Sequence, residues 1–198
     1  MKNIAFNYLV LLMVCLTVTW TQAKSTVKRK VLIVYLSRTN NTKAIAEIIN
    51  SNIGGQLVAL ELEKPYPADY RAAVEQVANE NESGYLPVLK TKIDSIGKYD
   101  TIFIGFPTWG MKLPPPIKSF LKQHNLNGKT LIPFNTNAGY GIGSSFDTLK
   151  ELCPNSRVLK GFEMQGGIER DGKLLVIKGA QQKEAETKIK KWLNDLKL

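Results

Sequence analysis

Hydroxyl and amide side chains gather in the segment Ser37–Lys43, SRTNNTK, which separates the apolar stretches at 31–36 and 44–49. A buried strand followed by a helix would explain the flanking stretches, and the polar segment would then begin the helix. Helix N-termini expose unpaired N–H groups and carry partial positive charge, so this segment could hold a phosphate. Asn40 and Asn41 tolerate a left-handed backbone, which would turn successive N–H groups inwards. A helix cap with no ligand explains the segment equally well.

Two further loops carry side chains suited to a flat aromatic ligand. The loop at 107–116, PTWGMKLPPP, contains Trp109, whose indole could stack on an aromatic ring. The loop at 135–145, NTNAGYGIGSS, has glycines that let the backbone approach a ligand, and Tyr140 offers a second aromatic face. Asn137 adds an amide for the edge of a heterocycle. The alternatives are a tryptophan packed on its neighbouring prolines and a flexible glycine loop.

Several other kinds of site are not supported by the sequence. Neither GxGxxG nor GxxxxGK[ST] occurs, which argues against a Rossmann dinucleotide site and a P-loop. No group of His, Cys, Asp and Glu has metal-ligand spacing and no hydrolase triad is visible, so we predict no metal site and no catalytic side chain. We expect His124 at the surface, at a helix end, and Cys153 at a half-buried position that closes a helix.

The elements that must position these loops alternate along the chain. Strands are expected in the apolar runs at 31–36, 57–62, 101–106, 130–134 and 157–162. Helices are expected around the apolar stripes at 44–49, 70–77, 117–121, 146–152 and 185–196. This alternation predicts an α/β fold, with a parallel sheet covered by helices on both faces, and ligands bind at the carboxyl ends of such strands. We also expect a long loop with a short helical piece at 79–98. An added ribbon is expected in 166–179, with a hairpin turn at Asp171-Gly172.

The first 23 residues have the composition of a secretory signal. Lys2 is followed by an uncharged apolar stretch at 8–20 and by small residues that end at Ala23. The apolar stretch has thirteen residues, whereas a membrane-spanning helix needs about 20. We therefore expect cleavage after Ala23, no stable membrane span, and a single domain at 24–198 that is periplasmic or extracellular.

The formal net charge of +10 at pH 7 is strongly basic. The lysines are spread along the chain and no arginine-aromatic cluster is present, so we do not expect a nucleic-acid partner. The charge instead favours acidic partners or anionic surfaces.

A phosphate-binding turn, an aromatic platform and a glycine-rich wall together suit a phosphorylated planar cofactor. The sequence resembles the flavodoxin family, in particular the group with a long segment between the second and third strands. The resemblance covers nearly all of 31–198 and rests on SRTNNT, YDTIFIGFPTWGMKLPPPIKSFL and GKTLIPFNTNAGYGIGSS. SRTNNT is a variant of the family's S/T-x-T-G-x-T phosphate loop, with Asn40 in the place of the glycine. The resemblance implies a doubly wound five-stranded parallel sheet of order 2-1-3-4-5 and flavin mononucleotide (FMN) as the cofactor.

The resemblance also implies which residues bind FMN. The phosphate would be held by Ser37, Arg38, Thr39, Asn40, Asn41 and Thr42. The ring would be flanked by Pro107, Thr108, Trp109, Gly110, Thr136, Asn137, Ala138, Gly139 and Tyr140. Trp109, Tyr140 or both would stack on the ring, and the Gly110 peptide could reorient when the ring gains a proton.

Three functions are compatible with this site. The first is an electron carrier outside the cytoplasm. Flavodoxins are typically acidic and dock on basic partners, whereas this chain is basic, so its redox partner protein is expected to have an acidic docking face. The second is an FMN-dependent NAD(P)H or quinone oxidoreductase, and the third is a non-redox protein that retains the fold. Soluble nicotinamide cofactors are expected in the cytoplasm, so export favours the electron carrier over a stand-alone oxidoreductase.

Overall fold

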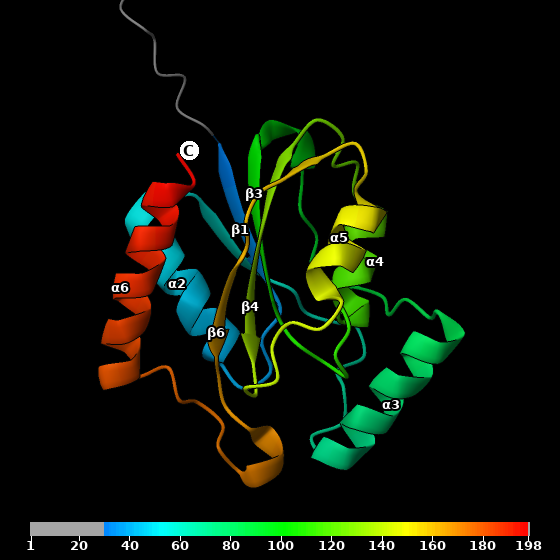
Figure 1. The fold of residues 1–198 in the computed structure, drawn as a ribbon. Coiled ribbons are helices and arrows are strands. Elements are labelled where there is room, and N and C mark those ends of the chain that lie inside the picture. The colour runs from blue at the N-terminus through cyan, green and yellow to red at the C-terminus, as the bar shows by residue number, and fades with distance from the viewer. Residues whose placement is uncertain (1–29, 198) are drawn as a thin grey trace, which may run out of the picture.

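A parallel β-sheet runs through the middle of the computed structural model, which describes residues 30–197 (Figure 1). Its strands are β1 Val31–Tyr35, β2 Gln56–Ala59, β3 Thr101–Pro107, β4 Thr130–Asn137, β5 Arg157–Val158 and β6 Phe162–Gln165. They are ordered β2-β1-β3-β4-β5, and β6 also pairs with β4. The expected order 2-1-3-4-5 and the parallel pairing are confirmed. The expected signal peptide at 1–23 lies outside the described residues and stays a prediction.

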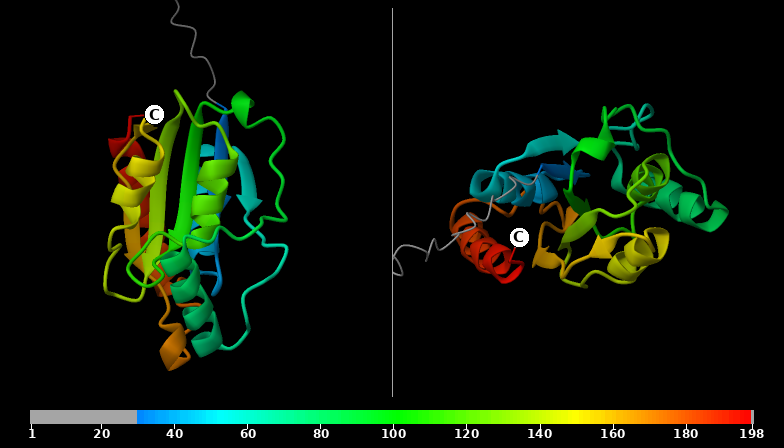
Figure 2. Two further views of the ribbon diagram at one scale, coloured as in Figure 1. Left: turned by 90° about the vertical axis from the view of Figure 1, so that its right-hand side faces the viewer. Right: turned by 90° about the horizontal axis from the view of Figure 1, so that it is seen from above.

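Helices cover both faces of the sheet (Figures 1 and 2). They are α2 Asn41–Ile53, α3 Tyr70–Ser83, α4 Pro115–Gln123, α5 Ser145–Leu152 and α6 Ala180–Asp195. Successive strand residues point to opposite faces. Leu32 and Val34 therefore join the core under α4 and α5, whereas Ile33 joins the core under α2 and α6. Trp192 of α6 is buried in the second core, and its ring packs near Phe103 at 5.9 Å between centroids.

Local signals set most helix boundaries. The Asp69 side chain accepts a hydrogen bond from the Ala72 N–H at 2.8 Å and caps α3. Gly54, with a φ of 68°, ends α2. Proline lies in the first turn of α4, where its missing N–H costs no helical hydrogen bond.

The fifth strand differs from the expected single strand at 157–162. It is divided into β5 and β6, which pair with opposite ends of β4. The register changes between Leu131↔Val158 and Phe134↔Phe162, so this strand has one residue more than β4 over the same span, as in a β-bulge. Pro133 lies opposite the interruption and has no N–H to contribute to a ladder.

Two other expectations need correction. The loop expected at 79–98 begins only after α3 ends at Ser83, and its short helical piece is η1, Ile96–Lys98. The ribbon expected in 166–179 is reduced to one antiparallel bridge, between Ile168 and Lys173, which encloses the short helix η2, Glu169–Asp171. The N–H groups that would extend a ribbon, at 176 and 177, donate to a side chain of α2.

The remaining expectations concern single residues and membrane helices. Cys153 is 7% exposed and closes α5, and burial raises the pKa of its thiol. His124 follows α4, but it is partly buried against Phe120 instead of fully at the surface. Leu152, expected in the apolar stripe of α5, is 47% exposed. Within residues 30–197, none of the helices has the length and apolar character to span a membrane.

Candidate functional site

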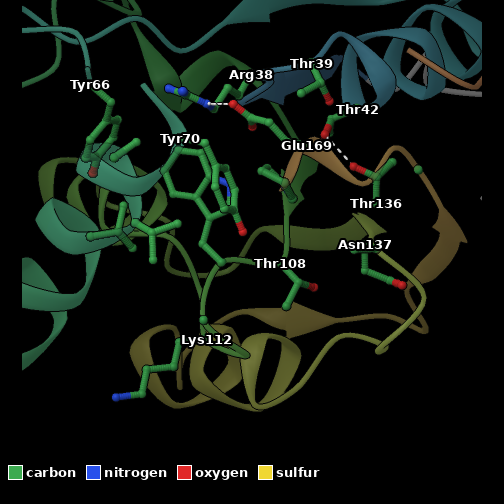
Figure 3. Close-up of a pocket in the computed structure, with 18 of the residues that line it drawn as sticks. Arg38, Thr39, Thr42, Tyr66, Tyr70, Thr108, Lys112, Thr136, Asn137 and Glu169 are labelled. Carbon is green, nitrogen blue, oxygen red and sulfur yellow. Dashed lines mark hydrogen bonds and ion pairs between the residues drawn. The ribbon is translucent and has the colours of Figure 1, made fainter. Parts of the chain in front are cut away.

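A cavity of about 550 Å³ opens beyond the carboxyl ends of β1, β3, β4 and β6 (Figure 3). The loops that follow these strands form part of its wall, and α3 forms another part. The loops that the sequence singled out therefore meet at one cavity. The predicted residues that line it are Arg38, Thr39, Asn41, Thr42, Pro107, Thr108, Trp109, Gly110, Thr136, Asn137 and Ala138. Ser37, Asn40, Gly139 and Tyr140 are not among the lining residues.

The start of α2 forms the polar end of the cavity. Asn40 precedes the helix with φ 64° and ψ 2°, the left-handed conformation expected of a residue that stands in the place of a glycine. The backbone N–H groups of Asn40, Asn41 and Thr42 donate to no acceptor within residues 30–197. The Thr42 hydroxyl lies 2.8 Å from the Thr136 hydroxyl, which ties the helix to the end of β4 (Figure 3). Open N–H groups at a helix N-terminus, beside hydroxyls, form a site suited to a phosphate.

The Asn41 side chain is used inside the protein. It is 2% exposed, and its Nδ2 donates to Thr39 Oγ1 at 2.9 Å and to the Leu174 carbonyl at 2.6 Å. Its Oδ1 accepts hydrogen bonds from the N–H groups of Val176 and Ile177 at 2.9 and 3.2 Å. Only the backbone N–H of Asn41 therefore remains for a ligand, while the side chain joins the start of α2 to 174–177.

Arg38 points to neighbouring loops. Its Nε lies 2.6 Å from a carboxylate oxygen of Glu169, and its terminal nitrogens donate to the carbonyls of Pro67 and Ala68 at 2.9 and 2.8 Å (Figure 3). The guanidinium thus joins three segments: the β1–α2 loop, the lead into α3 and η2. The charge of the guanidinium is offset by Glu169. The polar end of the cavity, at the start of α2, therefore depends on uncharged hydrogen-bond donors.

A tight turn presents Trp109 to the cavity. Gly110 and Met111 both have positive φ, 57° and 59°, and the Lys112 N–H donates to the Trp109 carbonyl at 3.0 Å. These values are those of a type I′ turn. The ring of Tyr66 meets that of Trp109 edge-on, with centroids 5.2 Å apart and planes at 89°.

The loop after β4 braces this turn. The Thr108 hydroxyl donates to the Gly141 carbonyl at 3.0 Å, and the Ser144 N–H donates to the Met111 carbonyl at 3.0 Å. A Cβ on Gly143 would lie 2.1 Å from that same Met111 oxygen, so a glycine is needed there for the two loops to touch.

The loop after β4 was expected to flank the flavin ring and to place Tyr140 on one of its faces, but its side chains are arranged differently. Tyr140 is 69% exposed and outside the cavity wall. Asn137 lines the cavity, but its Oδ1 accepts hydrogen bonds from the N–H groups of Gly139 and Gly141 at 2.9 and 3.2 Å. The side-chain oxygen of Asn137 therefore holds its own loop in shape, and the aromatic residues at the cavity come from other segments.

Several lining residues were missed by sequence reasoning. They are Tyr66, Tyr70, Ala73, Val74, Val77, Ala78, Asn81, Glu82, Lys112, Gly166, Gly167 and Glu169. Most belong to α3, whose apolar spacing was visible. A period of 3.6 residues identifies an apolar helix face but does not say whether it meets a core or a ligand. The Pro-Tyr-Pro sequence at 65–67 was the available signal for an aromatic residue in a constrained loop.

The buried carboxylate of Glu80 holds Tyr66, one of these lining residues, in place. Glu80 of α3 is 5% exposed and accepts hydrogen bonds from the Tyr66 hydroxyl and from Gln76 Nε2. Burial, together with the hydrogen bond to Glu80, raises the pKa of Tyr66 well above its usual value. Tyr66 therefore stays protonated as a donor to Glu80, and its ring remains beside Trp109.

Comparisons with known proteins identify the family. A model of the flavodoxin family matches residues 30–196. The chain belongs to the flavodoxin family. Among curated proteins, no match to the sequence was found.

Solved flavoprotein structures resemble this one. A candidate flavoprotein from Bacteroides eggerthii is 29% identical with a TM-score of 0.69, over 86% of this chain and 99% of that chain. A flavoprotein from Lactobacillus acidophilus in complex with FMN is 28% identical with a TM-score of 0.62, over 68% and 93% of the two chains. A flavodoxin from the domain Archaea, 18% identical with a TM-score of 0.50 over 80% and 92%, shares the fold. The protein is thus flavodoxin-like by both family and fold.

Proposed function

We propose that this protein binds FMN in the cavity and transfers electrons outside the cytoplasm. The observation that carries the proposal is the set of open N–H groups at the start of α2, those of Asn40, Asn41 and Thr42. Asn41 and Thr42 line a cavity that also contains an aromatic platform. The Lactobacillus flavoprotein, which is in complex with FMN, supports the choice of cofactor. Bound FMN supplies the redox chemistry.

The residues of this chain would hold and shield the cofactor. The N–H groups at the start of α2 and the hydroxyl of Thr39 would bind the phosphate. They are uncharged hydrogen-bond donors, and unlike the Arg38 guanidinium they are not paired with a carboxylate. Trp109 would contact the ring system, supported edge-on by Tyr66. A Cβ on Gly110 would meet nothing within 4 Å, so its peptide has room to reorient beside the ring.

The proposed location and partner rest on the sequence alone. The segment 1–23 carries the pattern of a secretory signal, and the net charge of +10 favours a redox partner protein with an acidic docking face. An FMN-dependent oxidoreductase is the second candidate, because α3 turns exposed apolar side chains towards the cavity.

Flavin titration tests the proposal. We expect the protein lacking residues 1–23 to bind FMN and to bind riboflavin, which lacks the phosphate, at least tenfold more weakly. Trp109→Ala should weaken FMN binding by about tenfold, or about 1.4 kcal/mol, as expected for the loss of an aromatic contact. Tyr85→Ala is the matched control, since Tyr85 is 56% exposed and does not line the cavity.

Each result has a distinct meaning. A protein that binds no flavin would leave only a non-redox role for the fold. Equal affinities for FMN and riboflavin would contradict a phosphate site at α2. An unchanged FMN affinity in Trp109→Ala would show that the indole does not contact the ring.

A further inference from the structure

We propose that the edge of the molecule opposite the cavity is a docking surface for an anionic lipid membrane. This amino edge is where β1 to β5 begin and where α2, α4, α5 and α6 end. It comprises residue 30, the first residue of each of these strands, the last five residues of each of these helices, and 54–55, 94–100, 124–129, 153–156 and 196–197. The inference goes beyond the proposed function and does not depend on FMN.

The amino edge is rich in positive charge. It carries eight cations and four anions, a net charge of +4: Lys30, Lys98, Lys122, Lys129, Lys150, Arg157, Lys191 and Lys197 against Asp94, Asp100, Glu151 and Asp195. The cavity end carries ten cations and eleven anions over 35–45, 59–83, 107–119, 137–149 and 163–184. A redox partner must approach the cavity, so we assign the excess positive charge at the other edge to a different contact.

Much of this charge is not neutralised within the protein. Four of the cations are exposed and take no part in the ion pairs found within residues 30–197: Lys30, Lys122, Arg157 and Lys191. The amine of Lys129 donates to the carbonyls of Gly97 and Tyr99 at 3.3 and 2.6 Å, so uncharged groups hold this side chain in place. The charge of the amino edge is therefore available to anionic groups outside the protein.

Helix stabilisation accounts for only part of this charge. Cations near a helix C-terminus offset the partial negative charge of the macrodipole, which suits Lys122 and Lys150 in the last turns of α4 and α5. By contrast, Lys30, Lys129 and Arg157 precede or begin strands, where this effect does not apply. A contact outside the protein explains their shared position.

The sequence before the amino edge favours a membrane over an acidic protein as the partner. The described chain begins at this edge with Lys30, and residues 24–29, KSTVKR, add three cations and no anion. Nine residues separate the apolar stretch at 8–20 from Lys30, and nine extended residues span at most roughly 30 Å. An apolar stretch that enters a membrane during export, as expected of a signal, would bring the amino edge to the lipid surface. Clusters of Lys and Arg beside a membrane bind anionic lipids.

A membrane at the amino edge would leave the cavity open. Figure 1 shows the start of β1 and the C-terminus at one end of the molecule and α3 at the other. Because α3 forms part of the cavity wall, the cavity would face away from the lipid and towards soluble partners.

Vesicle sedimentation tests the surface. The expected mature chain, 24–198, is mixed with vesicles of phosphatidylglycerol and phosphatidylcholine or with vesicles of phosphatidylcholine alone, and the bound fraction is measured. We expect binding to the anionic vesicles only. Binding should be lost as salt rises from about 0.1 M to about 1 M, because the Debye length falls from about 10 Å to about 3 Å.

Two triple variants locate the contact. The first removes three exposed cations of the amino edge: Lys122→Gln, Arg157→Gln and Lys191→Gln. Since each cation near an anionic surface contributes about fivefold, the partition coefficient on anionic vesicles should fall about a hundredfold. The matched control removes three exposed cations of the cavity end: Lys64→Gln, Arg71→Gln and Lys183→Gln. Its partition coefficient should fall by less than about fivefold, and equal urea midpoints would show that both variants are folded.

Hydrogen exchange provides a measurement that needs no variant. When anionic vesicles are added to the unmodified protein, backbone amides at 94–100 and 124–129 should exchange more slowly. The amides of α3 should exchange at an unchanged rate, because the helix lies at the far end of the molecule (Figure 1).

The outcomes separate this inference from its alternatives. No binding to anionic vesicles, or equal losses in the two triple variants, would refute the amino edge as a lipid-docking surface. Protection of α3 in place of the amino edge would overturn the orientation. Binding to polyglutamate but not to vesicles would overturn the choice of lipid and favour an acidic protein. The flavin titration is a separate measurement, so failure of either proposal leaves the other intact.

Discussion

Replacing Asn41 with alanine should destabilise the protein more than any surface substitution of an asparagine. The Asn41 amide connects the start of α2 to 174–177 through three hydrogen bonds and makes a fourth to the Thr39 hydroxyl. Alanine can make none of them. The two backbone N–H groups at 176 and 177 would lose their acceptor, and the Leu174 carbonyl would lose its donor.

The expected cost follows from burial. Ile177 is 2% exposed, so its unpaired N–H should cost about 2 kcal/mol, while that of the partly buried Val176 should cost about 1 kcal/mol. The free energy of unfolding should therefore fall by about 3 kcal/mol, out of the 5–15 kcal/mol roughly typical of a domain. With a urea slope of about 2 kcal/mol/M, the midpoint would fall by about 1.5 M.

Two further variants sharpen this experiment. Asn41→Asp keeps an acceptor for both N–H groups and should cost only about 1 kcal/mol in urea unfolding. Asn52→Ala is the control, because the Asn52 side chain donates a single hydrogen bond, to the Ile48 carbonyl, from an exposed position. It should change stability by less than about 0.5 kcal/mol. A loss below about 1 kcal/mol in Asn41→Ala would refute the bridging role of the side chain.

Two other predictions concern the turn at the cavity and the effect of pH. Gly143→Ala places a Cβ 2.1 Å from the Met111 carbonyl, so the turn must shift and FMN affinity should fall about tenfold in a titration. Gly128→Ala has a similar positive φ but open space around its Cβ, and should lower stability without changing FMN affinity. Burial lowers the pKa of His124, so the unfolded chain takes up a proton more readily as pH falls below about 6.5. The contribution of His124 to the free energy of unfolding is therefore complete above that pH and declines as pH falls towards the pKa of the folded state. Between pH 7.5 and 5.5, His124→Asn should lose less free energy of unfolding than the unmodified protein, as measured in urea. The difference between the two losses should be less than about 1 kcal/mol, because the ring is partly exposed. An equal loss in both proteins would exclude this contribution.

Local patterns predicted the fold because each one reports an interaction close in sequence. Apolar runs marked the strands, and apolar stripes of helical spacing marked the helices, each of which lies within or overlaps an observed helix. The division of the fifth strand was missed, because it depends on the position of Pro133 in a neighbouring strand. That pairing becomes visible only when the strands are assembled.

The site was predictable in position but not in the use of each side chain. Three loops were expected together because the carboxyl ends of parallel strands share one edge. Arg38 and Asn41 were expected at a phosphate, yet their partners Glu169 and Leu174 follow more than a hundred residues later. Charge and hydrogen-bonding capacity are evident from a residue's type, but the partner that uses them is set by tertiary structure.

The long-range ties of the β1–α2 loop bear on the order in which the protein matures. Arg38 and Glu169 are 131 residues apart, and Thr42 and Thr136 are 94 apart. Contacts over such separations require both segments to be present and cost more loop-closure entropy than local contacts. The open N–H groups of α2 thus acquire their surroundings only after the last third of the chain has docked. Cofactor loading would then be the final step of biogenesis, and a chain truncated before 169 would present a strand and helix without a formed receptor.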